Sequence, residues 1–236
     1  MINPFLAEFI GTMILLLLGN GVVANVVLNK TKGNNGGWIV ITFGWAIAVF
    51  VGVYMTASSS GAHLNPIVSF VLAILGKLAW RDLPFYIISQ FLGAMAGSIL
   101  VYLTYKKHYD QTEDIALIKA TFCNEPAIRN VSYNLISEII GTFVLILGIL
   151  FLTGSEKSLG SLDALPVALL ILGIGLSLGG ATGYAINPAR DLGPRIVYAI
   201  LPIKQKGSPD WSYSWIPVLG PILGGLLAVG IFILLT

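Results

Sequence analysis

Two Asn-Pro pairs and one arginine are the residues of this chain whose types and spacing could do chemistry. Asn65-Pro66 and Asn187-Pro188 each precede an apolar run, and Arg190 closely follows the second pair. Asn is a strong N-cap and Pro is favoured at the first helical position, so each pair predicts the start of a short helix. Two such helix starts would bring partial positive charge and amide donors to one place. A centre of this kind binds water or hydroxyl oxygens and repels cations and protons.

The composition indicates the medium in which these residues must be positioned. Of the 236 residues, 56% are hydrophobic and 10% are charged, whereas a soluble domain carries about 25% charged residues. These values predict an integral membrane protein and exclude a disordered chain. The net charge of +2 is small for a nucleic-acid binder, and the single Cys123 excludes an intramolecular disulfide and a cysteine-built zinc site. We expect no cofactor, no metal and no nucleic-acid partner.

Six apolar segments are candidates for membrane spans, which need about 20 residues. We predict spans over residues 2–28, 38–56, 83–105, 134–152, 165–178 and 213–235, with the longest polar loop at residues 106–130. Residues 66–75 and 188–201 are too short to cross, and runs of that length can be re-entrant. Taken alone, each short run could also be an amphipathic helix at the membrane surface.

An internal repeat relates the two halves of the chain. The segment from Glu8 to Thr12 returns from Glu138 to Thr142, the first Asn-Pro pair returns as the second, and Gly93 and Gly97 return as Gly220 and Gly224, at offsets of 130, 122 and 127 residues. Each half has three spans, an odd number, so the second half is inverted. Inverted repeats place their site near the midplane, where broken helices meet. Irregular backbone is tolerated there only inside protein or along a water-filled cavity, which predicts a pore.

These motifs resemble those of the aquaporin and glycerol facilitator family. The resemblance rests on Ser-Gly-Ala-His-Leu-Asn-Pro at residues 60–66 and Asn-Pro-Ala-Arg-Asp-Leu-Gly-Pro at residues 187–194, and it covers nearly the whole chain. It implies an all-α membrane protein with six transmembrane helices and two re-entrant half-helices in an inverted repeat. It also implies one channel domain over residues 1–236, with repeats at 1–105 and 131–236 joined by residues 106–130, and a homotetramer with one pore per subunit.

The resemblance implies two constrictions in the pore. The central one contains Asn65, Pro66, Ile67, Asn187, Pro188 and Ala189. Ile67 stands where the family usually has alanine, and we expect it to change the packing or to narrow the centre. The second constriction, the selectivity filter, contains Trp45, Gly175, Tyr184 and Arg190, which are placed by their distance from the two Asn-Pro pairs.

The four filter residues combine hydrogen-bond donors with apolar ring faces. An arginine at membrane depth is expensive and by default functional, and its planar fork can donate to two oxygens at once. Trp45 and Tyr184 offer apolar faces to the carbon chain of a solute, although Trp45 alone could face lipid and Tyr184 alone could be packing. Gly175 leaves room, and Asp191 and Pro217 match the facilitator pattern.

The filter predicts a passive channel for small neutral solutes. Facilitators often have Phe at the place of Tyr184, whose hydroxyl would make the constriction more polar or tighter. We expect glycerol, similar polyols and dihydroxyacetone-like molecules to pass, with water as co-permeant and with ions and protons excluded. Urea, a preference for water or lactic acid, and a secondary active transporter remain alternatives. An enzyme is not expected, because the sequence offers no metal-ligand cluster and no nucleophile-base pair.

Two carboxylates and one histidine complete the predicted site. Glu8 and Glu138 lie near the starts of their spans, where a carboxylate at the membrane surface costs little. The resemblance implies instead that each accepts backbone N–H groups of a re-entrant loop. His63 and Leu64 precede Asn65 and are expected to line the pore.

The location implied by the resemblance is a bacterial cytoplasmic membrane, with both termini in the cytoplasm. This orientation places three cations inside (Lys77, Arg81 and Lys157) and nine outside, Arg195 among them. The balance is the reverse of the positive-inside rule. We follow the motif match, because it is more specific than the statistical charge rule.

Overall fold

The computed structural model describes residues 2–152 and 162–236, and these residues are helical with no strand. The helices are α1 (Pro4–Val27), α2 (Gly37–Ser60), α3 (Pro66–Ile74), α4 (Leu83–Tyr109), α5 (Ile115–Ala120), α6 (Val131–Leu152), α7 (Ala164–Ser177), α8 (Pro188–Ile200) and α9 (Ile216–Leu235). By length and apolar composition α1, α2, α4, α6 and α9 can each cross a membrane, and α7 is a shorter apolar helix. The predicted fold class is confirmed. Lys157 lies outside the described residues.

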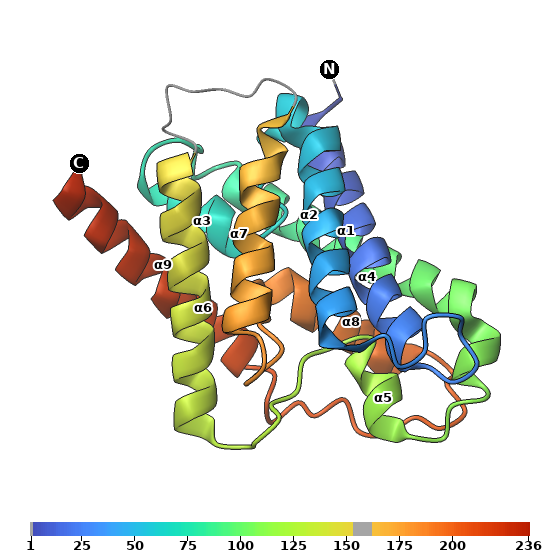
Figure 1. Ribbon diagram of the computed structural model, residues 1–236. Coiled ribbons are helices and arrows are strands. Elements are labelled where there is room, and N and C mark those ends of the chain that lie inside the picture. Colours follow the sequence, from blue (N-terminus) through green and yellow to red (C-terminus); the bar gives the residue numbers. More distant parts are fainter. Residues whose placement is uncertain (1, 153–161) are drawn as a thin grey trace.

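The long helices pack in two corresponding groups. α1 runs along α2 and α4, α6 runs along α7 and α9, and α2 meets α7 between the groups (Figure 1). Glycines permit the closest approaches: a Cβ atom on Gly97 would lie 2.4 Å from Met13 O, and one on Gly224 would lie 2.4 Å from Ile139 O. Small residues at such crossings are typical of membrane helices, whose backbones must approach closely to gain dispersion energy.

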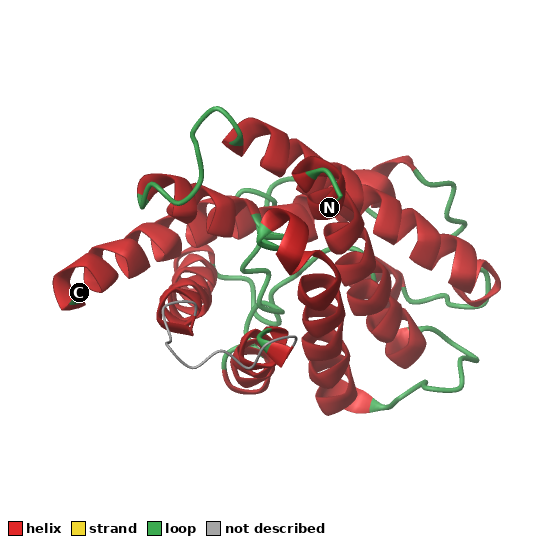
Figure 2. Ribbon diagram, turned by 90° about the horizontal axis from the view of Figure 1, so that it is seen from above, coloured by secondary structure: helices red, strands yellow, loops and turns green. Residues whose placement is uncertain are grey.

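The two short helices lie between these groups rather than on the surface. α3 lies in the upper half of Figure 1 and α8 in the lower half, and loops run through the middle of the bundle in Figure 2. Six of the nine residues of α3 and nine of the thirteen residues of α8 are buried. The alternative of amphipathic helices at the membrane surface is therefore wrong.

The connecting segment is more ordered than a solvated polar loop. α4 continues to Tyr109, and the Asp114 carboxylate caps the short helix α5. After α5, Phe122 is buried against Tyr198 of α8, and the centroids of the two rings are 5.3 Å apart. Cys123 lies in the same cluster, and burial raises the pKa of its thiol to about 12. This thiol stays protonated at neutral pH and acts as a small apolar group.

Candidate functional site

A cavity of about 480 Å³ lies between the two groups of helices. It reaches from Arg190 to Lys77 and Asp163 and is walled by α2, α6, α7 and the loops before α3 and α8. The predicted site residues that line it are Trp45, His63, Leu64, Asn65, Tyr184, Asn187 and Arg190. The structure therefore brings residues of both Asn-Pro motifs and three of the four filter residues to one space.

The two loops that enter this cavity have the same unusual backbone. Ala62 and Leu64 have φ values of 49° and 51°, and Tyr184 and Ile186 have φ values of 42° and 44°. A non-glycine residue in this left-handed region costs about 1–2 kcal/mol. Both loops therefore depend on surrounding groups that hold them in place.

Glu8 and Glu138 are the groups that hold the loops. Glu8 accepts hydrogen bonds from His63 N at 2.9 Å and Leu64 N at 2.8 Å. Glu138 accepts from Ala185 N at 3.0 Å and Ile186 N at 2.9 Å, and from Thr182 Oγ1. Glu8 is 0% and Glu138 1% exposed, so the alternative of a carboxylate at the membrane surface is wrong.

The two asparagines connect the halves of the chain at the centre of the cavity. Asn65 Nδ2 donates to Ile186 O at 2.9 Å, and Asn187 Nδ2 donates to Leu64 O at 2.8 Å. The Oδ1 atoms cap α3 and α8 by accepting from Ile67 N and Ala189 N. Because an amide nitrogen carries two hydrogens, each asparagine keeps one more donor in a side chain that lines the cavity.

Arg190 and Trp45 both line the cavity and contact each other. The Arg190 guanidinium carbon lies 4.2 Å from the Trp45 ring centroid, which is a cation–π contact. Among the described residues, no protein group accepts a hydrogen bond from the Arg190 side chain, although the residue is only 8% exposed. Its N–H groups are therefore available to a molecule in the cavity.

Gly175 and Tyr184 contact each other beside the cavity. A Cβ atom on Gly175 would lie 3.0 Å from Tyr184 Cζ and 3.1 Å from Tyr184 Oη. The room expected from Gly175 is thus occupied by the tyrosine ring. The Tyr184 hydroxyl is buried without a hydrogen-bond partner in the described part of the chain.

Ile67 packs away from the cavity. A Cβ atom on Gly225 of α9 would lie 2.6 Å from Ile67 Cγ2, and Ile67 shares a buried apolar cluster with Val71 and Ile146. Ile67 is not among the residues that line the cavity, so the expected narrowing of the centre is not seen in this structure. The side chain fits because glycine faces it on α9.

Replacing Ile67 with alanine should lower stability and leave solute selection unchanged. The lost contacts cost about 2–5 kcal/mol for a buried isoleucine. Thermal unfolding in detergent and a solute permeability ratio measure the two effects. The double variant Ile67→Ala/Gly225→Ala partly refills the gap and should recover some stability. A changed permeability ratio in Ile67→Ala would contradict this placement.

Arg195 is a neighbour of the site whose burial the sequence did not indicate. Counted from the sequence among the outer cations, it is fully buried in α8. Its Nε donates to Asp191 Oδ1 at 2.9 Å, and its Nη atoms donate to Asn124 O, Asp191 Oδ2, Pro209 O and Asp210 O. Asp191 also accepts from Asn124 N at 2.7 Å. The i,i+4 spacing of opposite charges in an apolar segment is the signal that could have found this pair.

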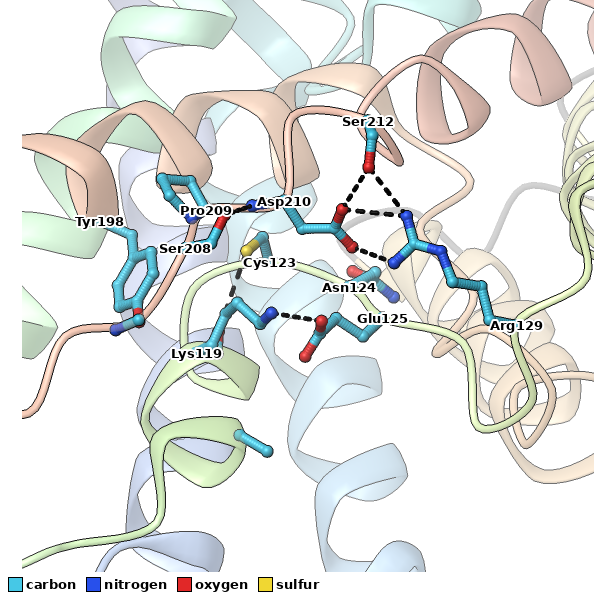
Figure 3. Close-up of polar contacts among 12 residues, drawn as sticks. Lys119, Cys123, Asn124, Glu125, Arg129, Tyr198, Ser208, Pro209, Asp210 and Ser212 are labelled. Atoms are coloured by element: carbon cyan, nitrogen blue, oxygen red, sulfur yellow. Dashed lines mark hydrogen bonds and ion pairs between the residues drawn. The ribbon is translucent and has the colours of Figure 1, made fainter.

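A second polar cluster joins two loops, as Figure 3 shows. Arg129 donates to both carboxylate oxygens of Asp210, at 2.6 and 2.9 Å, and also to Ser212 Oγ. Lys119 pairs with Glu125 nearby. Hydrogen bonds from Arg129 and Ser212 lower the pKa of Asp210 from 3.8 to about 2. These contacts join residues 119–129 to residues 208–212.

The stabilising effect of Asp210 should depend on pH. A carboxyl group whose pKa is lowered by folding contributes stability above its unfolded pKa, and the contribution is lost as the pH falls toward 2. Because the Arg129 side chain is 52% exposed, we expect Asp210→Asn to cost at most about 1 kcal/mol at neutral pH. The melting temperatures of the two proteins should converge between pH 4 and pH 2. A gap that persists at pH 2 would argue against the ion pair.

The fold and this site define a helical multi-pass membrane protein with a cavity where two capped short helices meet. The profile of the family described as "Major intrinsic protein" matches residues 1–232. The chain therefore belongs to the major intrinsic protein family.

Several relatives match the chain over nearly the same length. The chain is 55% identical over 230 residues to a "Probable glycerol uptake facilitator protein" of Thermotoga maritima, covering 98% of each chain. It is 56% identical over 232 residues to a "Glycerol uptake facilitator protein" of Streptococcus pneumoniae strain R6, covering 98% of this chain and 99% of the relative. The structure of the aquaglyceroporin from Plasmodium falciparum superimposes with a TM-score of 0.86 at 33% identity, covering 97% of this chain and 94% of that one.

Proposed function

We propose that the protein is a passive membrane channel for glycerol and similar small neutral solutes, with water as co-permeant. The observation that carries the proposal is the buried Arg190 guanidinium, which lies over Trp45 and faces the cavity with no protein acceptor among the described residues. The names of the glycerol facilitators and the aquaglyceroporin support the same solute class.

The proposed selection combines a donor side with an apolar side. Arg190 donates to two solute oxygens at once, which a polyol supplies on neighbouring carbons. The Trp45 and Tyr184 rings contact the C–H side of the solute. Because glycerol presents oxygens along one side and carbon along the other, it satisfies both surfaces in one orientation. Dihydroxyacetone has the same arrangement and should also pass.

The proposed exclusion of cations and protons arises at the centre. The helix starts after Asn65 and Asn187 carry partial positive charge, and the asparagine amides donate to a passing oxygen. A water or hydroxyl held by donors on both sides cannot pass a proton along a chain of hydrogen bonds through this point. The roles proposed for Glu8 and Glu138 are to brace the loops, while His63 and Leu64 line the route.

The proposed surroundings are a bacterial plasma membrane and a homotetramer with one pore per subunit. The apolar faces of the spanning helices suit the lipid bilayer, and each chain forms one channel domain with its own cavity. Native mass spectrometry in lipid-like detergent tests the tetramer. A monomer with full solute flux would contradict it.

Stopped-flow light scattering of proteoliposomes tests the function. Outward gradients of glycerol, dihydroxyacetone, urea and lactic acid are compared with a purely osmotic water gradient. We expect fast glycerol and dihydroxyacetone flux that follows the solute gradient and is unchanged by ionophores. Fast water flux without either solute, lactic acid flux alone, or accumulation that depends on an ion gradient would overturn the proposal.

A further inference from the structure

The ring of Tyr184 lies in a slot beside the cavity that the Asn-Pro motifs do not reveal. Gly175 forms one wall, as described above, and Gly179, the second residue after α7, forms the next. A Cβ atom on Gly179 would lie 2.4 Å from Tyr184 Cδ1 and 2.9 Å from Trp38 Cζ2. A Cβ atom on Gly179 would also lie 2.7 Å from Gly175 O, so a side chain there would overlap the tyrosine ring and press on the α7 backbone, whereas one on Gly175 would make a tight contact with the ring.

Trp38 of α2 closes the slot from the other side. Its Nε1 donates to Gly175 O at 3.0 Å, and its ring meets the Tyr184 ring edge-on with centroids 5.9 Å apart. Thr42 Oγ1 donates in turn to Trp38 O, and its methyl group would contact a Cβ atom on Gly175. One hydrogen bond and one edge-on ring contact thus connect α2, α7 and Tyr184.

Tyr184 is held in this slot by shape. Its backbone has a left-handed φ of 42°, and the next two residues are bound through their N–H groups to Glu138. Its hydroxyl is buried in the slot with no partner among the described residues, and its side chain also lines the cavity. Because the buried hydroxyl has no hydrogen bond, the position of the ring in the slot carries a free-energy cost. If the ring left the slot, it would enter the adjacent cavity.

We propose that Trp38 and Gly179 are positioning residues for solute selection. With Gly175 they hold the Tyr184 ring back at the wall of the pore, so the slot sets the width left beside Arg190. The inference rests on the proposed function and extends it to two residues outside the filter. Trp38 holds Gly175 through its hydrogen bond and holds the Tyr184 ring through their edge-on contact. Gly179 leaves room for the Tyr184 ring because it has no side chain.

Gly179→Ala tests the slot, with Gly180→Ala as the matched control. A Cβ atom on Gly180 meets nothing within 4 Å, and neither glycine has a positive φ. We expect Gly179→Ala to lower the glycerol-to-water permeability ratio by about tenfold, the low end of the discrimination that a one-methylene change in a pocket produces. Gly180→Ala should keep the ratio of the parent protein. Equal ratios in the two variants would overturn the proposal.

The Tyr184→Val background separates positioning from general damage. In that background there is no ring to displace, so adding Gly179→Ala should lower the glycerol-to-water ratio much less than it does in the parent protein. The effect that remains comes from the approach of the new Cβ atom to Gly175 O, at 2.7 Å. A fall as large as in the parent protein would show that Gly179 does not act through the Tyr184 ring, which contradicts the slot.

Trp38→Phe provides a test that does not overpack the protein. Phenylalanine keeps an aromatic ring and loses the donor to Gly175 O, so we expect a smaller fall in the ratio than for Gly179→Ala. An unchanged ratio would remove Trp38 from the proposal. If the parent protein conducts water and no glycerol, the proposed function fails separately. The slot is then tested by water flux alone, which should fall in Gly179→Ala and not in Gly180→Ala.

Discussion

Glu138→Ala should produce little folded protein, and whatever folds should keep its glycerol-to-water permeability ratio. The substitution removes three hydrogen bonds to a buried carboxylate, from Thr182, Ala185 and Ile186. Hydrogen bonds to charged groups contribute about 1.5–3 kcal/mol each. Two residues of this loop are also in the left-handed region and would lose their support. The expected loss exceeds about 4 kcal/mol, which is a large part of the stability of a typical domain.

Glu138→Gln is the graded control. The glutamine oxygen can accept from Thr182 and Ala185, whereas its NH₂ group would face the N–H of Ile186 without accepting. Yield and melting temperature should therefore lie between those of the parent protein and Glu138→Ala. Glu8→Ala should behave like Glu138→Ala, because Glu8 holds two backbone N–H groups of the other loop. A changed solute preference at full yield would contradict a bracing role for either carboxylate.

Local sequence signals were sufficient for the fold and much of the candidate site. Hydropathy predicted each long helix because the bilayer imposes a minimum apolar length. Asn65 and Asn187 predicted the starts of α3 and α8 because N-capping is a local property. The repeat placed Glu8 and Glu138 in corresponding positions, and both hold a loop in the structure.

The directions in which individual side chains point depend on contacts between residues that are distant in the sequence, so local signals could not predict them. Ile67 packs outward because Gly225 faces it, and nothing near residue 67 indicates that glycine. The Tyr184 ring lies in its slot because Trp38 and Gly175, 137 residues apart, are joined by a hydrogen bond. The polar composition of residues 106–130 was also a poor guide to their burial. Their charged residues suggest a solvated loop, yet Phe122 and Cys123 are buried there.

Arg195→Met should destabilise the protein by about 3–5 kcal/mol, the usual cost of leaving one member of a buried ion pair without its partner. Both side chains of the Arg195–Asp191 pair are 0% exposed. The substitution leaves the Asp191 carboxylate with Asn124 N as its remaining partner among the described residues. It also removes the donors to Asn124 O, Pro209 O and Asp210 O. Melting temperature in detergent measures the loss.

The pattern of recovery should identify the pair as the cause. Arg195→Lys keeps a charge that reaches Asp191, but its single amine cannot serve the carbonyls of Asn124 and Pro209 together, so it should recover part of the stability. Asp191→Leu/Arg195→Met removes both charges and should be less destabilised than the sum of its single variants. Additive effects would mean that the carbonyl contacts, rather than the ion pair, hold residues 124 and 209 against α8. In either case the loss of stability in Arg195→Met should exceed that in Asp210→Asn. The Arg129 side chain is half exposed, so water screens its ion pair with Asp210 and the pair contributes little free energy.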